Sequence, residues 1–239
     1  MEQQTSAGLR ADARRNREQI IAAARTMFLR IGVNVPMEEI ARAAGVGIGT
    51  LYRRFPDRAE LIRAVSLDNL HRMVELARQL ERDEPDPEAA LRVLLRAIRH
   101  GYLGIVTTIV SAHAVEAVEA TPEITGYRDE LLAAVDRLVR RCQERGAIRP
   151  DVGPGDLLLV LAALSRLVPA ADEDLGEMVF QRLFALMMDG LAPAAGPVLP
   201  GRPVTYADIE RLRRLGGLAG FGKPGTISAA SPATPPAAH

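Results

Sequence analysis

The sequence contains one cysteine, Cys142, and no tryptophan among its 239 residues. A single thiol excludes an internal disulfide and any zinc site built from several cysteines. Aromatic residues make up 4% of the chain, which favours a core of aliphatic helices over an aromatic-rich β-sandwich. The longest apolar run, 157–164, is far shorter than the roughly 18 residues that a membrane span needs. Because the polar N-terminus also lacks the apolar core of a signal peptide, we expect a cytoplasmic protein without a membrane segment.

The formal net charge is zero, because thirty basic residues balance thirty acidic ones. All of the basic residues except Lys223 are arginines. The balance conceals two opposite parts. Residues 1–72 hold twelve arginines against eight acidic residues, an excess of four positive charges, and residues 73–239 carry the matching negative excess. A basic N-terminal unit on an acidic remainder indicates that only the first unit meets a polyanion such as DNA.

Apolar residues recur with helical spacing along most of the chain, and no segment alternates as a β-strand would. Gly32 and Gly45 stand where helices should end, Pro36 is expected at a first helical position, and Asp57 with Glu60 forms a capping box. We therefore predict an all-α fold. The expected helices cover residues 17–31, 36–44, 48–55, 58–80, 91–109, 122–145, 156–168 and 173–191.

The last 48 residues, 192–239, differ in composition because they hold eight of the sixteen prolines and seven of the twenty glycines. A segment of this kind buries too little apolar surface to offset its ordering entropy, so we expect it to be mostly disordered. One short amphipathic helix is predicted at 205–215, opened by Thr205 and Asp208 in capping-box spacing. Docking on its own domain or fraying in solvent is favoured for this helix over binding a partner.

Residues 36–55 have the pattern of a helix-turn-helix. The glycines at 45 and 47 permit a tight turn between the two helices. Leu51 and Phe55, four residues apart, form the apolar face of the second helix and leave its other face free for a major groove. The first helix should be buried through Ile40 and through small residues at the crossing, which are Ala41, Ala43 and Ala44.

The segment from Pro36 to Leu61, PMEEIARAAGVGIGTLYRRFPDRAEL, resembles the DNA-binding unit of the tetracycline-repressor (TetR) family of bacterial regulators. Its most specific phrase is Gly49-Thr50-Leu51-Tyr52-x-x-Phe55-x-x-Arg58, and the similarity covers residues 14–75. The resemblance implies that a long helix joins this head to a helical domain for ligand binding and dimerisation at 76–191. It also implies a repressor without enzymatic activity or cofactor, which a small apolar or amphipathic effector releases from a palindromic operator.

The resemblance assigns DNA contacts to Arg42, Gly47, Ile48, Gly49, Thr50, Tyr52, Arg53, Arg54 and Arg58. At Pro36, Gly47 and Ile48 the family more often has polar residues, so anchoring to phosphates should rest on arginines more than usual. Ile48 either touches a thymine methyl or packs within the protein. The run Arg14–Arg17 is expected to act as a flexible arm, reaching into a minor groove.

The effector pocket implied by the resemblance lies between the helices of 87–146, and its candidate residues are His100, Tyr102, His113 and Tyr127. Each of them also suits a plain core or surface role. The spacing of the two histidines gives no support for a metal site. Two subunits should pair through 156–168 and 173–191, with burial inside one subunit as the alternative. Cys142 is predicted to be a small buried apolar residue.

Two other classes of protein remain as alternatives. An enzyme on a helical scaffold has little support, because Gly45-Val-Gly-Ile-Gly lacks the third glycine of a dinucleotide motif and no lysine of the Walker type or catalytic triad stands out. A protein-interaction module that has lost DNA binding is compatible with the departures at Pro36, Gly47 and Ile48. Substitution of Tyr52 and Arg53 distinguishes this module from a DNA-binding regulator.

Overall fold

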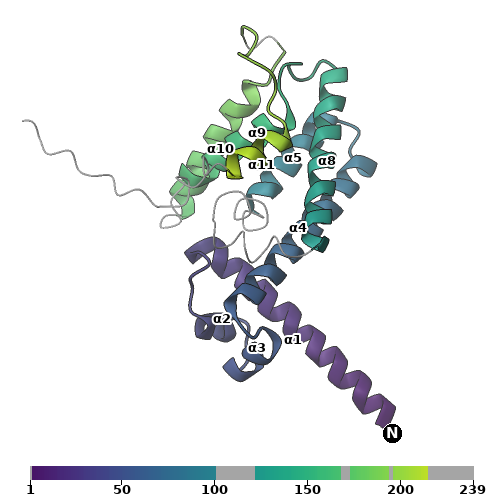
Figure 1. Ribbon diagram of the computed structural model, residues 1–239, viewed down its shortest axis with the longest axis vertical. Coiled ribbons are helices and arrows are strands. Elements are labelled where there is room, and N and C mark those ends of the chain that lie inside the picture. The colour runs from purple at the N-terminus through teal and green to yellow at the C-terminus, as the bar shows by residue number, and fades with distance from the viewer. Residues whose placement is uncertain (1, 101–121, 168–172, 194–195, 215–239) are drawn as a thin grey trace, which may run out of the picture.

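The computed structural model describes residues 2–100, 122–167, 173–193 and 196–214 (Figure 1). The regular structure in these ranges is entirely α-helical, which confirms the predicted fold class. No helix of the described residues is long and apolar enough to cross a membrane. The helices are α1 (Glu2–Ile31), α2 (Met37–Ala43), α3 (Ile48–Arg54), α4 (Arg58–Asp83), α5 (Pro87–His100), α8 (Pro122–Glu144), α9 (Pro154–Leu167), α10 (Glu173–Asp189) and α11 (Tyr206–Arg214).

The N-terminal head packs α1, α2, α3 and the first turns of α4 around one apolar core. Its most deeply buried side chains include Ile20, Phe28, Ile40, Leu51 and Phe55. They occur at helical spacing in the sequence, so each helix turns one apolar stripe inward while its polar residues stay in water. Burial of such side chains provides most of the stability of short helices, which are marginal on their own.

Local signals in the sequence fix the ends of these helices. Gly32 and Gly45 have φ angles of 101° and 67°, in the left-handed region that favours glycine. The Asp57 carboxylate caps α4 by accepting a hydrogen bond from the amide of Glu60 at 2.8 Å. Pro36 is the N-cap of α2 and not, as predicted, its first helical residue, because helical geometry begins at Met37.

The long helix α4 runs from the head into the C-terminal domain, where it packs along α8 (Figure 1). Leu70, Val74 and Ala77 are buried, whereas the predicted apolar positions Met73 and Leu80 are only half-buried. Two ion pairs add surface links, Arg78–Glu130 at 2.7 Å and Arg137–Glu81 at 2.8 Å. Because such exposed pairs contribute at most about 1 kcal/mol each, the apolar contacts dominate this packing.

Two arginines of α5 form cation–π contacts with aromatic rings of α10. The guanidinium of Arg99 lies 3.8 Å from the centre of the Phe180 ring, and that of Arg96 lies 5.1 Å from the Phe184 ring. The two phenyl rings are themselves stacked, with centroids 5.4 Å apart. Since cations interact favourably with aromatic faces, this arrangement holds α10 firmly against α5.

The proline- and glycine-rich tail begins with a structured segment, residues 196–214, which we call the C-terminal strap. Two residues that follow α8 hold its first part. Arg149 donates a hydrogen bond to the carbonyl oxygen of Pro197 at 2.7 Å, and Asp151 accepts one from the amide of Leu199 at 2.7 Å. The Arg149 guanidinium, together with this amide, holds the pKa of the Asp151 carboxyl well below its usual range.

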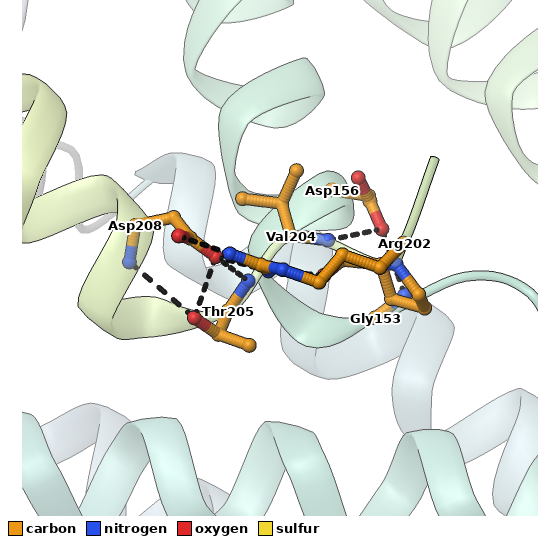
Figure 2. A network of polar contacts seen from close by, with 7 residues as sticks. Gly153, Asp156, Arg202, Val204, Thr205 and Asp208 are labelled. Carbon is orange, nitrogen blue, oxygen red and sulfur yellow. Dashed lines mark hydrogen bonds and ion pairs between the residues drawn. The ribbon is translucent and has the colours of Figure 1, made fainter. Parts of the chain in front are cut away.

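The second part of the strap crosses the start of α9 (Figure 2). Asp156 accepts hydrogen bonds from the amides of Gly153 at 2.8 Å and Val204 at 3.2 Å. Thr205 and Asp208 cap α11 reciprocally, and α11 lies against α9 with Ile209 fully buried. The expectation of disorder does not hold for residues 196–204, whereas the short helix predicted at 205–215 is present as α11 and docks on its own domain. Hydrogen bonds to Arg149, Asp151 and Asp156 hold the first part of the strap in place, and amino-acid composition does not reveal such contacts.

Two other expectations about the head are wrong. α1 extends from Glu2, so the run Arg14–Arg17 belongs to a helix and is not a flexible arm. Arg14 lies 3.7 Å from Glu18, one helical turn away, which suits a helical conformation. Ala43 is exposed, because the seven-residue helix α2 turns its other face, with Ile40 and Ala41, toward the core.

Candidate nucleic-acid interface

The helix-turn-helix lies at the end of the molecule opposite α9 and α10 (Figure 1). The turn between α2 and α3 closes with a hydrogen bond from the amide of Val46 to the carbonyl of Ala41 at 3.0 Å. Leu51 is completely buried, and Phe55 is buried directly after α3. One face of α3 therefore packs in the core, and the opposite face is available to contact another molecule.

The exposed face of α3 combines hydroxyl, cationic and apolar groups. Tyr52 is 44% exposed and Ile48 is 39% exposed, and Arg53 also lies in solvent. Thr50 is half-buried, and Arg42 on α2 is exposed. Hydroxyl and guanidinium groups of this kind bind phosphates and base edges, so the chemistry of this surface fits duplex DNA.

The glycines on either side of Ile48 leave open space around α3. Neither Gly47 nor Gly49 has a positive φ, and a Cβ atom at either position would meet no described atom within 4 Å. The protein's own packing therefore does not explain glycine at these two positions. Within a helix, glycine costs about 0.5–1 kcal/mol relative to alanine, so Gly49 lowers the stability of α3.

Arg58, at the first position of α4, is engaged within the head. Its Nη1 atom donates hydrogen bonds to the carbonyl oxygens of Val33 at 2.8 Å and Val35 at 2.5 Å. These bonds fasten the loop between α1 and α2 to the start of α4. Arg54 is half-buried, and its Nε atom has no hydrogen-bond partner among the described residues. A contact of either arginine with DNA stays a prediction.

Only one of the four predicted effector residues can be placed. Tyr102 and His113 lie outside the described residues, as does the side chain of His100. Tyr127 on α8 meets His71 of α4 edge to face, with ring centroids 5.3 Å apart. Both rings line a cleft of about 410 Å³ between α1, α4 and the start of α8. Tyr127 thus lies where the head meets the C-terminal domain.

Two buried polar residues of α4 were missed by the sequence analysis. Ser66 is 1% and Asn69 is 2% exposed. Neither the Ser66 hydroxyl nor the Asn69 amide nitrogen has a hydrogen-bond partner in the part of the chain that the structure describes. A buried polar group without a partner costs about 1–3 kcal/mol. Polar residues three apart within an apolar helical stripe were the available signal in the sequence.

The C-terminal helices leave apolar side chains in solvent. Leu175, Met178 and Leu186 lie on one side of α10, and Leu186 is 67% exposed. Val160 is exposed on the neighbouring helix α9. Contiguous apolar surface is uncommon on monomeric proteins and marks contact with another chain.

Cys142 lies inside the C-terminal domain, as predicted. It is completely buried on α8 and forms no disulfide. Removal from water raises the pKa of its thiol to about 11, because the thiolate loses its hydration. The thiol is therefore protonated at physiological pH and behaves as a small apolar residue.

Comparison with known families covers both parts of the chain. The family described as "Bacterial regulatory proteins, tetR family" matches residues 20–65, which include the helix-turn-helix. The family described as "Transcriptional regulator SbtR-like, C-terminal domain" matches residues 86–193. The strap lies beyond both matches.

A TetR regulator from Streptomyces coelicolor, SCO0520, is 31% identical, with a TM-score of 0.57 over 75% of this chain and 99% of that one. The repressor LfrR of Mycolicibacterium smegmatis is 26% identical over 63% of this chain and 76% of its own length. Other curated regulators match over 41% to 48% of their length. The regulator AibR shares the fold at 19% identity, with a TM-score of 0.53 over 74% of this chain and 98% of that one.

The similarity to SCO0520 extends over nearly the whole of that protein, and the two family matches fall on the head and the C-terminal domain separately. The order of the domains, the helix-turn-helix and the long helix between them agree with this similarity. The chain belongs to the TetR family of DNA-binding transcriptional regulators.

Proposed function

We propose that this protein is a repressor that binds a palindromic operator in the cytoplasm as a homodimer and is released by a small effector. The observation that carries the proposal is the exposed face of α3, where Ile48, Tyr52 and Arg53 stand beside two glycines that the fold does not require. A solvated helix has no need of such an arrangement, whereas a helix that enters a major groove does.

The proposed DNA contacts divide by chemistry. The arginines and hydroxyls suit phosphates and base edges, while the glycines allow close approach of the backbone. Arg58 acts partly by holding the loop between α1 and α2 in place. The contact set is Arg42, Gly47, Ile48, Gly49, Thr50, Tyr52, Arg53, Arg54 and Arg58.

Selection from a random duplex library, followed by binding measurements at several salt concentrations, tests DNA recognition. We expect selected duplexes to share an inverted repeat and their affinity to fall steeply with salt. Tyr52→Phe and Arg53→Ala should each weaken binding by about tenfold, equivalent to about 1.4 kcal/mol. Arg211→Ala, an exposed arginine on α11, is the matched control. Selection of no shared sequence, or equal affinity of all variants, would refute DNA recognition by α3.

Dimerisation is supported by the exposed apolar side chains of α9 and α10. A palindrome presents two half-sites about 34 Å apart, and a two-fold dimer presents two heads to them. The side of α10 that carries Leu175, Met178 and Leu186 is suited to a self-complementary interface. Pairing through these helices removes from water the apolar surface that a single subunit exposes.

Sedimentation analysis of Leu186→Glu tests this interface. We expect the native protein to be a dimer and this variant to shift toward a monomer, because the interface would bury an unpaired charge. Val198→Glu, at a strap residue that is 81% exposed, is the control and should remain dimeric. A monomeric native protein, or a Leu186→Glu dimer of native affinity, would exclude this interface.

Effector binding is supported by Ser66 and Asn69, which are buried on α4 and each carry a polar atom without a hydrogen-bond partner among the described residues. A ligand with a hydrogen-bond acceptor and an apolar body would satisfy the Asn69 amide and stay buried. The similar regulator AibR is known in complex with isovaleryl coenzyme A and operator DNA, so a protein of this fold binds both kinds of ligand. In this chain α4 links the domains, since it begins with Arg58 in the head and carries Asn69 farther along.

A panel of acyl and aromatic compounds, added to the complex with a selected duplex, tests release by an effector. We expect at least one compound to weaken DNA binding by about fivefold to 150-fold, the range of typical couplings. Asn69→Ala should reduce that response while leaving DNA affinity without the compound unchanged. Tyr127 and the predicted residues His100, Tyr102 and His113 form the second group to substitute. A response that is identical in Asn69→Ala would exclude the amide as an effector contact.

A further inference from the structure

We infer that Ile48 determines part of the operator sequence by contacting the C5 methyl group of a thymine in the major groove. The inference rests on the proposed binding of α3 to operator DNA and names the feature of the base that this residue reads. Ile48 is the first residue of α3, and the first residues of a recognition helix are those that contact base edges.

Ile48 is an exposed apolar side chain flanked by two residues without side chains. Gly47 and Gly49 on either side have no side chains, and the space where their Cβ atoms would lie holds no described atom within 4 Å. Ile48 itself is 39% exposed. On the next turn of the same face lies Tyr52, four residues later, which is also exposed. The sec-butyl side chain of Ile48 therefore stands between two positions that are open.

The core of the head does not need this exposed side chain. Leu51 and Phe55 are fully buried and fill the contact between α3 and the rest of the head. With 39% of its surface exposed, Ile48 keeps an apolar part in water, and this part gains free energy when a partner covers it. Of the two readings left open by the sequence, packing inside the head thus explains the position of Ile48 less well.

The chemistry of the major groove indicates which group of DNA would cover the Ile48 side chain. Every base edge in the major groove presents hydrogen-bond donors or acceptors, and the C5 methyl of thymine is the apolar group among them. Isoleucine has no polar atom in its side chain, so it would leave the donors and acceptors of guanine, cytosine or adenine without partners. Thymine also carries the O4 acceptor, but its C5 methyl gives an apolar side chain a surface to cover, which the major-groove edges of the other bases lack.

The test uses full-length protein and duplexes selected from a random library. Each thymine of the selected sequence is replaced in turn by uracil, which differs only by the absent methyl. At one position in each half-site, we expect uracil to weaken binding by about fourfold for the single substitution, and by about tenfold or more for both half-sites together. Replacement of that thymine by 5-methylcytosine, with guanine opposite, should be tolerated better than replacement by cytosine.

Variants of Ile48 test whether this residue causes the loss of affinity with uracil. In Ile48→Ala the penalty for uracil should disappear, because no side chain reaches the methyl, whereas Ile48→Val should keep most of it. Leu212→Ala is the matched control, since Leu212 on α11 is also 39% exposed but lies in the strap, outside the head. This control should retain the full uracil penalty.

Three results are distinguishable. A uracil penalty at symmetric positions that Ile48→Ala abolishes supports the inference. Selected duplexes without any such penalty, or with a penalty that Ile48→Ala retains, overturn it while the proposed DNA binding stands. If no shared sequence is selected at all, both the proposed function and this inference fail. The uracil measurement on the native protein needs no variant, so the absence of a penalty overturns the inference even if Ile48→Ala does not fold, and Ile48→Val then tests whether the residue carries the effect.

Discussion

The amide of Gly155 donates a hydrogen bond to the carbonyl oxygen of Val204 across 3.0 Å, and this contact joins the strap to the start of α9. The two backbones are so close that a Cβ atom on Gly155 would lie only 2.4 Å from the same oxygen. Figure 2 shows Val204 beside Asp156, which accepts a hydrogen bond from the amide of the same Val204. The strap, which follows the part of the chain that matches the family, is therefore fitted to this particular domain.

Gly155→Ala should separate the strap from α9. We expect the free energy of unfolding to fall by about 1–3 kcal/mol, because the added methyl forces the two backbones apart. Trypsin should also cleave faster after Arg211, which Leu212 follows, as the strap loosens. Urea unfolding and timed proteolysis measure the two effects.

Gly126→Ala is the control for this prediction, because a Cβ at Gly126 meets no described atom within 4 Å. In that helix the same substitution should raise stability by about 0.5–1 kcal/mol. Opposite signs for the two variants are the expected outcome. A gain of stability in Gly155→Ala would show that the strap does not pack as tightly as described.

Arg58→Ala should destabilise the head even without DNA. Loss of the hydrogen bonds to Val33 and Val35 removes a charged donor from two carbonyl groups, which costs about 1.5–3 kcal/mol. The exposed Arg53→Ala should change stability by less than about 0.5 kcal/mol. Urea unfolding followed by circular dichroism compares them. Equal stabilities of the two variants would contradict an anchoring role of Arg58.

Gly49→Ala should affect stability and DNA binding in opposite directions. The helix gains about 0.5–1 kcal/mol from alanine, since nothing in the described protein obstructs the new methyl. The same methyl stands on the face that approaches DNA, so affinity for a selected duplex should fall by about tenfold, or about 1.4 kcal/mol. Gly126→Ala should gain stability without losing affinity. Unchanged affinity of Gly49→Ala would mean that DNA does not approach this part of α3.

The thiol of Cys142 should react only when the domain unfolds. Burial raises its pKa to about 11, and at pH 8 the folded protein then holds about one thiolate per thousand molecules. Reaction with a disulfide reagent should accelerate in urea along the unfolding transition. Because the pKa is higher in the folded state, ionisation favours the unfolded one. Stability should fall as the pH rises from about 8.5 toward 11, and Cys142→Ala should lack this fall.

Local physical chemistry made the head predictable from the sequence. The stripe from Ile20 to Phe28, the glycines at 32 and 45 and the cap at Asp57 each act within a few residues, and each is found where expected. The errors there concern the length and orientation of helices, and the largest is that α1 begins at Glu2 and not at the predicted residue 17. Ala43 faces solvent, because in a seven-residue helix a half-turn decides which small residue meets the core.

Relations between distant residues were not predictable. The strap is held by Asp151 and Asp156, about 48 residues before their partners Leu199 and Val204, and a composition rich in proline and glycine gave no sign of it. Likewise, nothing in the sequence indicated the hydrogen bonds of Arg58 to two carbonyl groups of the loop between α1 and α2, and its contact with DNA stays a prediction.

By itself the sequence determined the all-helical class, the helix-turn-helix and the family resemblance, because helical periodicity, caps and turn glycines are encoded at short range. The tertiary structure decided which side chains face water. It left Ile48 exposed between two glycines, buried Ser66 and Asn69 with a polar atom that no described residue pairs, and bound the strap to α9. Exposure and hydrogen-bond satisfaction depend on which segments meet in space, and that depends on the packing of the whole chain.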